Sequence, residues 1–320
     1  MVSVVTSKGG KETPYLTFDR SSWKELRNST PLTLNTEDLE EIKGINENIS
    51  LDEVSDIYLP MSRLLHLYYK ASRALYRARR QFLGIEHEKI TFIIGIAGSV
   101  AAGKSTTARL LRTLISSWPG SPKVDLIPTD GFIYPNSVLI ERKILNRKGF
   151  PESYNVRNLI SFLYDLKSGI GNLKVPVYSH LTYDIVPDKF ITVDRPDILL
   201  LEGLNVLQTP QSKEAREPQF FVSDFFDFSI YIDADPSFIK KWFIERFKVL
   251  MRTAFSKKES YFNSYSRLSI DEAESVAGKI WDEINAVNLL ENIAPTKYHA
   301  HLILEKNIDH TIDHVLMRRI

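Results

Sequence analysis

The chain has 320 residues, of which 43% are hydrophobic and 25% charged, and its formal net charge at pH 7 is +1. This length is sufficient for a large core in one or two domains, and the near-zero charge disfavours a dedicated nucleic-acid or membrane surface. The absence of cysteine excludes disulfides, thiolate catalysis and cysteine–metal sites. No apolar run is long enough to span a bilayer, and the first residues lack the apolar segment of a secretory signal. We therefore expect a soluble, cytoplasmic protein that binds neither nucleic acid nor membrane.

The N-terminal quarter is predicted to be helical. Residues 1–14 show no periodicity and are expected to be disordered. Short helices are predicted over Phe18–Arg27 and Thr36–Asn48, and a longer one begins at Pro60 and ends near Leu83. The apolar face of the long helix can pack on a sheet or form a dimer interface. Residues 15–88 are thus interpreted as a helical part that precedes an α/β core in residues 89–320, within a single domain.

The segment 90–107, ITFIIGIAGSVAAGKSTT, contains a phosphate-binding loop. Its apolar run predicts a buried strand, and Thr106–Trp118 is predicted to be a helix. Between them the sequence matches G-x-x-x-x-G-K-[ST], in which backbone N–H groups and a helix N-terminus hold phosphates. A glycine-rich turn without a ligand is the alternative, but the strand before the motif and the helix after it favour nucleotide binding. The residues expected to contact ATP are Gly98, Ser99, Val100, Ala101, Ala102, Gly103, Lys104, Ser105 and Thr106.

Four further strands are predicted along the rest of the chain. They cover Val124–Ile127, Asp197–Leu201, Phe226–Ile232 and His301–Glu305, the last of these being taken as the final strand. Near-continuous apolar strands separated by helical segments are typical of a mostly parallel sheet with helices on both faces. In such α/β folds ligands bind at the carboxyl ends of the strands. Asp130, Glu202 and Asp233 lie at those ends. The segment 208–224 is expected to be a polar excursion on the surface.

Phosphoryl transfer requires charge neutralisation on the phosphates and a carboxylate near the acceptor hydroxyl. Lys104 is expected to contact the phosphates, and the Ser105 hydroxyl is a candidate ligand for Mg²⁺. Asp130 is the candidate base, with a simple Asp-Gly turn as the alternative. Glu202 follows an apolar strand in the manner of a metal-binding acid, with a structural cap as the alternative.

The C-terminal third contributes an arginine, aromatic residues and amides. Helix 236–251 carries Phe243 and Phe247 with Arg246 between them, so Arg246 either faces the transferred phosphoryl group or is exposed. The following stretch, with Phe255, Tyr261, Phe262 and Tyr265, is predicted to be a lid or pocket wall, with plain core as the alternative. A helix over Ala277–Leu290 places Asn285 and Asn288 on one side, as ligands or as surface amides.

Other classes of activity are disfavoured by missing motifs. The chain has no D-x-x-G or N-K-x-D element of a guanine-nucleotide switch, no G-x-S-x-G elbow and no protein-kinase signature. A nucleic-acid-binding ATPase is disfavoured by the near-neutral charge. A kinase that phosphorylates a nucleoside or a sugar remains the alternative within the same fold.

Longer blocks of sequence resemble one family, the bacterial type I pantothenate kinases. They include PTDGFIYPN (128–136), RKGFPESYN (147–155), PVYSHLTYDIVP (176–187), DILLLEGLNVLQ (197–208) and WDEINAVNLLENI (281–293), so the resemblance covers nearly the whole chain. It implies a homodimeric P-loop kinase that uses ATP and Mg²⁺ to phosphorylate pantothenate to 4′-phosphopantothenate, the first step of coenzyme A synthesis. It also implies feedback inhibition by coenzyme A in competition with ATP.

Matching positions imply roles for single residues. The catalytic residues would be Asp130, Lys104 and Arg246, while Asn46 and His310 would flank the adenine of ATP. The metal ligands would be Ser105 and Glu202. The residues implied for the pantothenate pocket are Asp130, Lys148, Tyr178, His180, Tyr183, Phe243, Arg246 and Asn285. Those implied for coenzyme A are Lys104, Arg109, His180, Phe247, Phe255, Phe262 and Tyr265.

Three positions depart from the family pattern, namely Ala102, Pro128 and Phe243, and a consequence is expected from the last. Phe243 stands where the family usually has tyrosine, so one hydroxyl contact to pantothenate is expected to be missing. Because a neutral hydrogen bond contributes about 0.5–1.5 kcal/mol net, we expect weaker substrate binding rather than lost activity.

Overall fold

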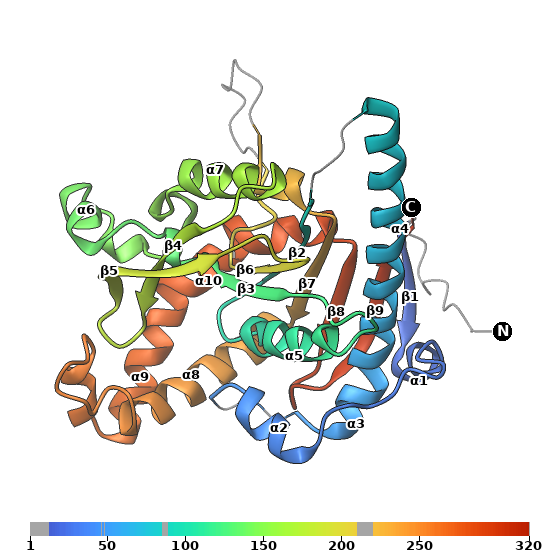
Figure 1. The fold of residues 1–320 in the computed structure, drawn as a ribbon. Coiled ribbons are helices and arrows are strands. Elements are labelled where there is room, and N and C mark those ends of the chain that lie inside the picture. The colour runs from blue at the N-terminus through green and yellow to red at the C-terminus, as the bar shows by residue number, and fades with distance from the viewer. Residues whose placement is uncertain (1–12, 46, 48, 85–88, 210–219, 320) are drawn as a thin grey trace.

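A computed structural model describes residues 13–45, 47, 49–84, 89–209 and 220–319. Its centre is a seven-stranded sheet in the order β1-β9-β8-β7-β2-β6-β3 (Figure 1). The strands in that order are β1 (Tyr15–Asp19), β9 (Ile312–Arg318), β8 (Leu302–Lys306), β7 (Phe228–Ala234), β2 (Phe92–Gly98), β6 (Ile198–Glu202) and β3 (Val124–Pro128). The five strands from β8 to β3 are parallel, whereas β9 is antiparallel to both of its neighbours, β8 and β1. The expected mostly parallel sheet is confirmed.

The central strand β2 is buried along its whole length. Its alternate side chains enter two different cores, with Ile94 and Ile96 on one face and Ile93 and Ala97 on the other. A strand covered on both faces has no solvent side, which is why its sequence is continuously apolar instead of alternating.

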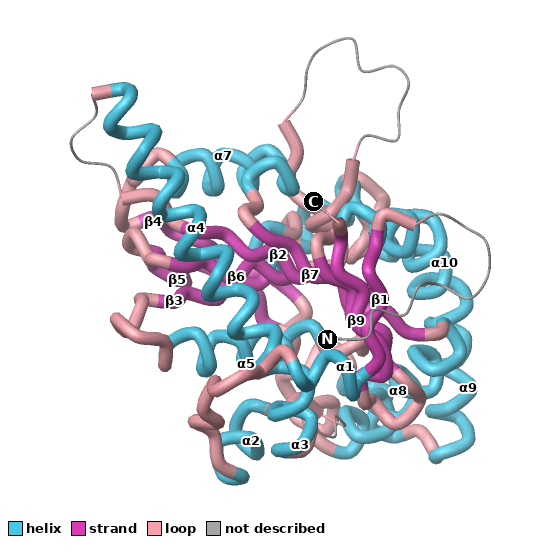
Figure 2. The backbone as a smooth tube through the Cα atoms, turned by 90° about the vertical axis from the view of Figure 1, so that its right-hand side faces the viewer, coloured by secondary structure: helices cyan, strands magenta, loops and turns pink. Residues whose placement is uncertain are grey.

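Helices cover both faces of the sheet, and Figure 1 shows α5 and α7 on opposite sides of it. The first face packs against α1 (Arg20–Glu25), α2 (Thr36–Ile42), α4 (Leu59–Leu83) and α5 (Lys104–Ser116), with the short α3 (Leu51–Glu53) and the π turn Val54–Tyr58 leading into α4. The second face packs against α7 (Val156–Lys167), the start of α8 (Pro236–Arg252) and the helical stretch that contains α10 (Ala286–Asn288). Figure 2 shows α4 running across the front of the sheet, above α5.

Two elements lie outside these layers. A hairpin of β4 (Leu173–Ser179) and β5 (Asp184–Val193) forms a separate antiparallel sheet, with α6 (Asn136–Glu141) beside it (Figure 1). Helix α9 (Ile270–Ile280) packs on α8 around a small core of its own. The predicted elements did not include this hairpin or α7. Within the described residues no helix is both long and apolar enough to cross a membrane.

The N-terminal prediction was wrong in two respects. The helix predicted over Phe18–Arg27 begins at Arg20, because Tyr15–Asp19 pairs with β9 as an edge strand of the main sheet. Asp19 ends that strand and caps the helix, since its Oδ1 accepts a hydrogen bond of 2.8 Å from the Ser22 N–H. The helix predicted over Thr36–Asn48 ends at Ile42.

The C-terminal prediction also needs correction. The strand predicted to be the last, His301–Glu305, is β8, and β9 follows it as an antiparallel partner. The helix predicted over Ala277–Leu290 is not uniform: α9 ends at Ile280, and π turns occupy Trp281–Asn285 and Leu289–Ile293. Most of the excursion predicted at 208–224 lies outside the described residues.

A partly buried ion pair connects three elements at the amino-terminal end of β2. The Lys167 ammonium of α7 pairs with Asp227 and also donates 3.0 Å to the Thr91 carbonyl. Asp227 accepts hydrogen bonds from the Ile93 N–H at 2.7 Å and from the Tyr76 hydroxyl of α4 at 3.1 Å. Because Asp227 is shared, it holds α4 and α7 against opposite faces of the same strand.

Replacing Asp227 by alanine is expected to lower the free energy of unfolding by about 2–4 kcal/mol, because the partly buried ammonium and the N–H lose their carboxylate partner. Urea unfolding followed by circular dichroism measures this. The control is Asp282→Ala, which removes the exposed ion pair with Lys240, and its expected loss is below about 1 kcal/mol. Equal losses in the two variants would contradict the role given to Asp227.

Candidate active site

The phosphate loop joins β2 to α5 through a backbone that only certain residues allow. Gly98 and Gly103 have φ values of 143° and 97°, and Ala101 has 59°. A Cβ at Gly98 would lie 2.6 Å from the Ile232 carbonyl oxygen of the neighbouring strand. Glycine is therefore required there both by conformation and by space. The turn brings the chain directly into α5 at Lys104, where the first backbone N–H groups of the helix are free to bind an anion.

Lys104 lies folded over this loop. Its Nζ donates a hydrogen bond of 2.7 Å to the Ser99 carbonyl. Burial lowers the pKa of Lys104, and the negative charges of Glu202 and Asp130 oppose this effect. The ammonium thus lies between the loop and two carboxylates, which is the position from which it can neutralise a phosphate.

Ser105 and Glu202 form a pair of oxygen ligands beside the loop. The Ser105 hydroxyl donates 2.9 Å to Glu202 Oε1. The second oxygen, Oε2, is buried and has no hydrogen-bond partner in the described part of the chain. A hydroxyl and a carboxylate with an unused oxygen are the hard donors that Mg²⁺ prefers, so these two residues fit a magnesium site.

Asp130 follows β3 on a single 3₁₀ turn, Thr129–Phe132, at the same edge of the sheet. Its carboxylate is 30% exposed and lies 3.6 Å from Nε2 of His180. It acts electrostatically on Lys104, on Arg246 and on Lys148. The parallel register thus brings the ends of β2, β3 and β6 together, and a carboxylate at Asp130 faces the phosphate loop.

Arg246 of α8 is half-buried, so the alternative in which this guanidinium is exposed is wrong. Burial lowers its pKa, while Glu47, Asp130 and Glu202 act in the opposite direction. Asp233, the third acid at the strand ends, instead pairs with Lys297 at 3.0 Å. Of the three acids at the strand ends, only Asp130 and Glu202 therefore act electrostatically on Lys104.

A second group of side chains gathers on the β4–β5 hairpin. The Lys148 ammonium donates 2.6 Å to the Tyr183 carbonyl and lies 4.2 Å from the centre of the Tyr183 ring and 5.0 Å from that of Tyr178. The Tyr178 and His180 rings are 5.2 Å apart. Burial raises the pKa of Tyr183 to about 12 and lowers that of Lys148 to about 8, although Asp184 and Asp130 oppose the change at Lys148. This pocket wall is polar, rigid and next to Asp130.

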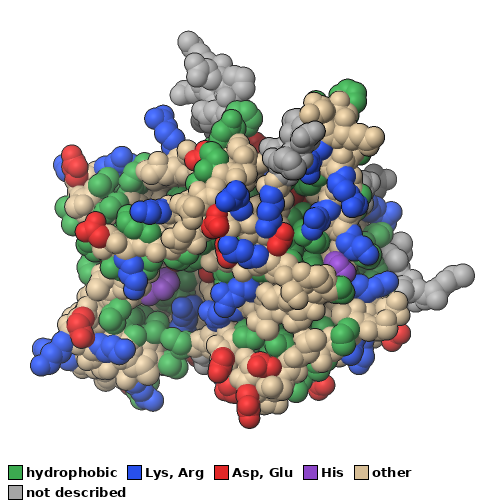
Figure 3. Space-filling view, viewed as in Figure 1, with side chains coloured by type: hydrophobic (Ala, Val, Ile, Leu, Met, Phe, Trp, Pro, Cys, Tyr) green, Lys and Arg blue, Asp and Glu red, His purple; other side chains and the backbone are tan. Residues whose placement is uncertain are grey.

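Space-filling Figure 3 shows Lys and Arg side chains around a hollow between this hairpin and the α8–α9 pair. Below the hairpin an aromatic cluster begins, with Tyr183 and Phe262 ring centres 4.8 Å apart. Phe247 contacts Phe255 and Tyr265 at 5.4 Å each, and Phe262 stacks on Tyr265 at 5.9 Å. These residues form the small core under α9, and they also form the apolar continuation of the polar pocket.

The asparagines of the C-terminal helical stretch have different surroundings. Asn285 is half-buried at the end of a π turn, and Phe243 packs on Trp281 of that turn at 5.8 Å. Asn288 is buried, and its amide donates 3.0 Å to the Gly149 carbonyl, which also accepts 2.9 Å from Asn205. Together the two amides fix the turn that carries Lys148. The role of Asn205 could not be predicted, since it depends on a contact with a residue 56 positions away.

The remaining predicted residues lie around α5 and the end of β8. Arg109 donates a hydrogen bond of 2.7 Å to the Ile42 carbonyl and one of 3.1 Å to the Thr106 hydroxyl, and the first of these connects α5 to the end of α2. His310 stacks on Trp242 with ring centres 4.2 Å apart, and its Nδ1 is buried without a partner among the described residues. Asn46 lies outside the described residues.

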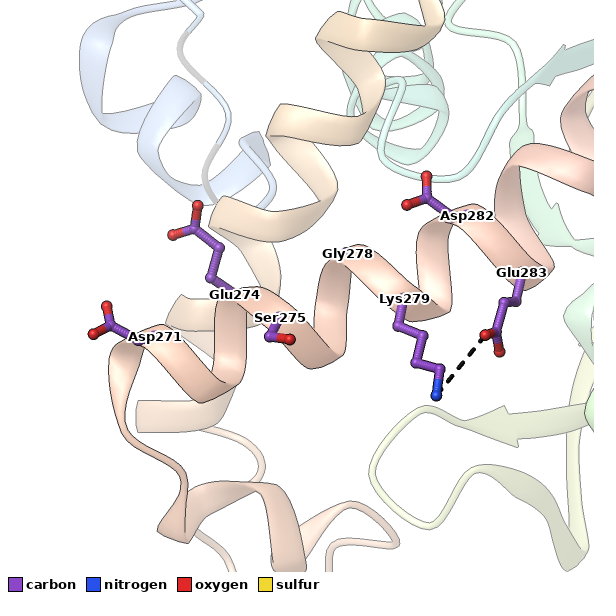
Figure 4. A pocket seen from close by; sticks show the side chains of 7 residues that line it. All are labelled: Asp271, Glu274, Ser275, Gly278, Lys279, Asp282 and Glu283. Atoms are coloured by element: carbon purple, nitrogen blue, oxygen red, sulfur yellow. Dashed lines mark ion pairs between the residues drawn. The ribbon is translucent and has the colours of Figure 1, made fainter.

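A separate wide hollow lies along α9, and Figure 4 shows its lining residues. Four of them are acidic: Asp271, Glu274, Asp282 and Glu283. Three of the four pair with lysines, namely Glu274 with Lys248, Asp282 with Lys240 and Glu283 with Lys279. Because carboxylates only accept hydrogen bonds and most of the lysines here are already paired, this hollow offers fewer donors to a polyphosphate than the phosphate loop does.

Comparisons with known proteins agree with this geometry. The Phosphoribulokinase / Uridine kinase family matches residues 93–248. Two solved structures share the fold at low identity: a putative fructose transport system kinase from Silicibacter sp. TM1040 and a D-glycerate 3-kinase from Cryptococcus neoformans. The fructose transport system kinase has a TM-score of 0.51 and 16% sequence identity, and the match covers 66% of this chain and 87% of that chain. The D-glycerate 3-kinase has a TM-score of 0.53 and 12% sequence identity, and the match covers 79% of this chain and 97% of that chain.

Curated relatives are much closer. The pantothenate kinase of Brevibacillus brevis is 56% identical over 96% of this chain and 97% of its own length. Those of Parvibaculum lavamentivorans and Vibrio cholerae are 56% and 54% identical, each over 96% of this chain and over 94% and 98% of their own lengths. The chain belongs to the pantothenate kinase family and has the P-loop kinase fold.

Proposed function

We propose that the protein transfers the γ-phosphoryl group of ATP to the primary hydroxyl of pantothenate and so produces 4′-phosphopantothenate, the first step of coenzyme A synthesis. The observation that carries the proposal is the single edge of the sheet at which the phosphate loop faces Asp130, with the polar wall of Lys148, Tyr178 and Tyr183 behind it. A coupled assay of ADP release with pantothenate, uridine and ribulose 5-phosphate as acceptors tests it. If ADP is released only with uridine or ribulose 5-phosphate, the acceptor is a nucleoside or a sugar and not pantothenate.

Each residue has one task in the proposed mechanism. The loop residues Gly98 to Thr106 hold the triphosphate with backbone N–H groups, and Lys104 neutralises it. Asp130 accepts the proton of the pantothenate hydroxyl. The hydroxyl oxygen forms a bond to the γ-phosphorus of ATP, and the bond between this phosphorus and the oxygen of ADP breaks. Arg246 faces the oxygens on which charge develops. Lys148, Tyr178, His180, Tyr183, Phe243 and Asn285 orient pantothenate, while His310 and Asn46 flank the adenine.

A magnesium ion would be held by Ser105 and Glu202, whose unpartnered Oε2 supports this assignment. When bound, it neutralises charge on the phosphates. The residues of the chain that act on the reacting atoms remain Lys104, Asp130 and Arg246.

Replacing Asp130 by asparagine is expected to lower kcat by at least about 10²-fold, because the acceptor hydroxyl loses its base. ATP affinity is expected to change by no more than a few-fold, since the phosphate loop is unaltered. The control is Asp233→Asn, which removes an acid at a neighbouring strand end that pairs with Lys297. Steady-state kinetics and ATP titration measure both effects. Retained turnover in Asp130→Asn would exclude it as the base.

The variant Arg246→Ala is expected to lower kcat by about 10²-fold or more while the KM for ATP changes little, because the guanidinium acts on charge that appears in the transition state. Arg252→Ala, an exposed position in the last turn of the same helix, is the control and should behave like the unaltered enzyme. If both variants have normal kcat, Arg246 has no catalytic role.

The lowered pKa of Lys148 predicts that the reaction with pantothenate depends on pH. Its pKa of about 8 means that the ammonium is charged below that pH and neutral above it. Because pantothenate is an anion, kcat/KM for pantothenate is expected to fall as the pH rises through about 8, in a series from about pH 6.5 to about pH 9.5. In Lys148→Met this fall should be absent and kcat/KM should be low throughout. An unchanged profile in the variant would assign the fall to another group.

Feedback by coenzyme A is the regulatory part of the proposal. Lys104, Arg109 and His180 would hold its phosphates, and Phe247, Phe255, Phe262 and Tyr265 would enclose its thiol end. The continuity of the aromatic cluster with Tyr183 supports this. We expect inhibition by coenzyme A to weaken as ATP rises. Inhibition that is independent of ATP concentration would contradict a shared site.

We further propose a homodimer in the cytoplasm, where ATP is supplied. Helix α4 supports the dimer, because its C-terminal half extends beyond the sheet (Figure 1) and the helix exposes Leu67, Leu75 and Phe82, with 52%, 71% and 87% of their surfaces accessible. A sedimentation mass equal to one chain of 36.8 kDa would contradict it. Cell fractionation tests the location.

A further inference from the structure

Lys306, at the carboxyl end of β8, is a buried cation for which the mechanism above has no task. Only 8% of its surface is accessible. The strand pairing shifts by one residue at this point, so that Glu305 faces His314 and Lys306 faces Ile312. Such a bulge commonly redirects a side chain next to an active site.

The Lys306 ammonium lies against the outside of the phosphate loop. Its Nζ donates a hydrogen bond of 3.3 Å to the carbonyl of Ala102. It also lies 2.7 Å from the point that a Cβ on Gly103 would occupy, so the absence of a side chain at Gly103 is what admits it. The Trp242 ring, with its centre 5.7 Å away, covers another side of the ammonium.

The environment of Lys306 is arranged to keep a positive group in place. Burial lowers its pKa, and the carboxylates of Glu47 and Glu53 act against that change. Glu53 is itself held by Arg20 and by the Ile312 N–H at 2.9 Å. Glu47 lies beside Gly103, with one buried carboxylate oxygen that has no hydrogen-bond partner in the described chain.

Because the peptide bond is planar, the contact of Lys306 with the Ala102 carbonyl also determines the direction of the Gly103 N–H. In a trans peptide the C=O of one residue and the N–H of the next point in opposite directions. Because Lys306 holds the Ala102 carbonyl, the Gly103 N–H points away from the Lys306 ammonium. We propose that Lys306 is a positioning residue that orients the Ala102–Gly103 peptide so that its N–H binds a nucleotide phosphate.

This inference deepens the proposed function and rests on the use of the loop for a nucleotide. The test is Lys306→Met, which keeps the length of the side chain and removes its donor. Affinities for ADP, AMP and adenosine are measured by calorimetry, together with steady-state kinetics. We expect the Kd for ADP and the KM for ATP to rise about tenfold, because one charge-assisted hydrogen bond is lost. The affinity for adenosine, which has no phosphate, and the KM for pantothenate should change less than twofold.

The pattern of affinities across the ligands separates this role from an effect on the adenine base and from the absence of any role in nucleotide binding. Equal losses for ADP, AMP and adenosine would mean that Lys306 acts through Trp242 and His310 on the base, and would overturn the proposal, as would unchanged ADP affinity. The control is Lys297→Met, which removes a partly buried lysine paired with Asp233 and away from the loop, and it should leave ADP affinity unchanged. If Lys306→Met does not fold, Lys306→Gln is measured in the same way. Failure of the unaltered protein to bind ADP would instead contradict the proposed function.

Discussion

The close approach of β2 to β7 at the phosphate loop is the constraint on which the rest of the site depends. At Gly98 the backbone comes so near to the Ile232 carbonyl that no side chain fits, and the φ of 143° is one that glycine adopts without strain. Because the chain turns at this point, α5 begins directly above the end of β2, and Lys104 enters the space between the strand ends. A loop displaced from β7 would move Lys104 away from Asp130 and Glu202 together.

Parallel pairing supplies the second constraint. Asp130 and Glu202 are 72 positions apart, but they follow strands β3 and β6 that pair in register from Val124–Ile198 to Pro128–Glu202. The carboxylates therefore meet at one edge although they lie far apart in the chain. The positive groups that balance them come from three other elements: Lys104 from α5, Arg246 from α8 and Lys148 from the turn fixed by Asn205 and Asn288.

The two faces of the sheet have different tasks. On one face the N-terminal helices pack on α5, and Arg109 and Tyr58 hold that helix by hydrogen bonds to Ile42 and Thr107. This fixes the axis of the helix whose N-terminus binds phosphate. On the other side α8 and α9 enclose an aromatic core that continues into the pocket wall at Tyr183. The nucleotide side is thus anchored by hydrogen bonds of the Arg109 and Tyr58 side chains, and the acceptor side by aromatic packing.

The sequence by itself determined the phosphate loop, the apolar parallel strands and the acids that follow them, because these depend on local residue types and on periodicity. It also indicated the family through long blocks such as 147–155 and 176–187. Only the tertiary structure decided that Tyr15–Asp19 is a strand, since its hydrogen-bond partner β9 lies almost 300 residues later. The same holds for the separation of Asp233 from Asp130, for the burial of Arg246 and for the contact of Lys306 with Ala102. Each of these results from a long-range contact, and a contact between distant residues leaves no periodic signal in the segment that makes it.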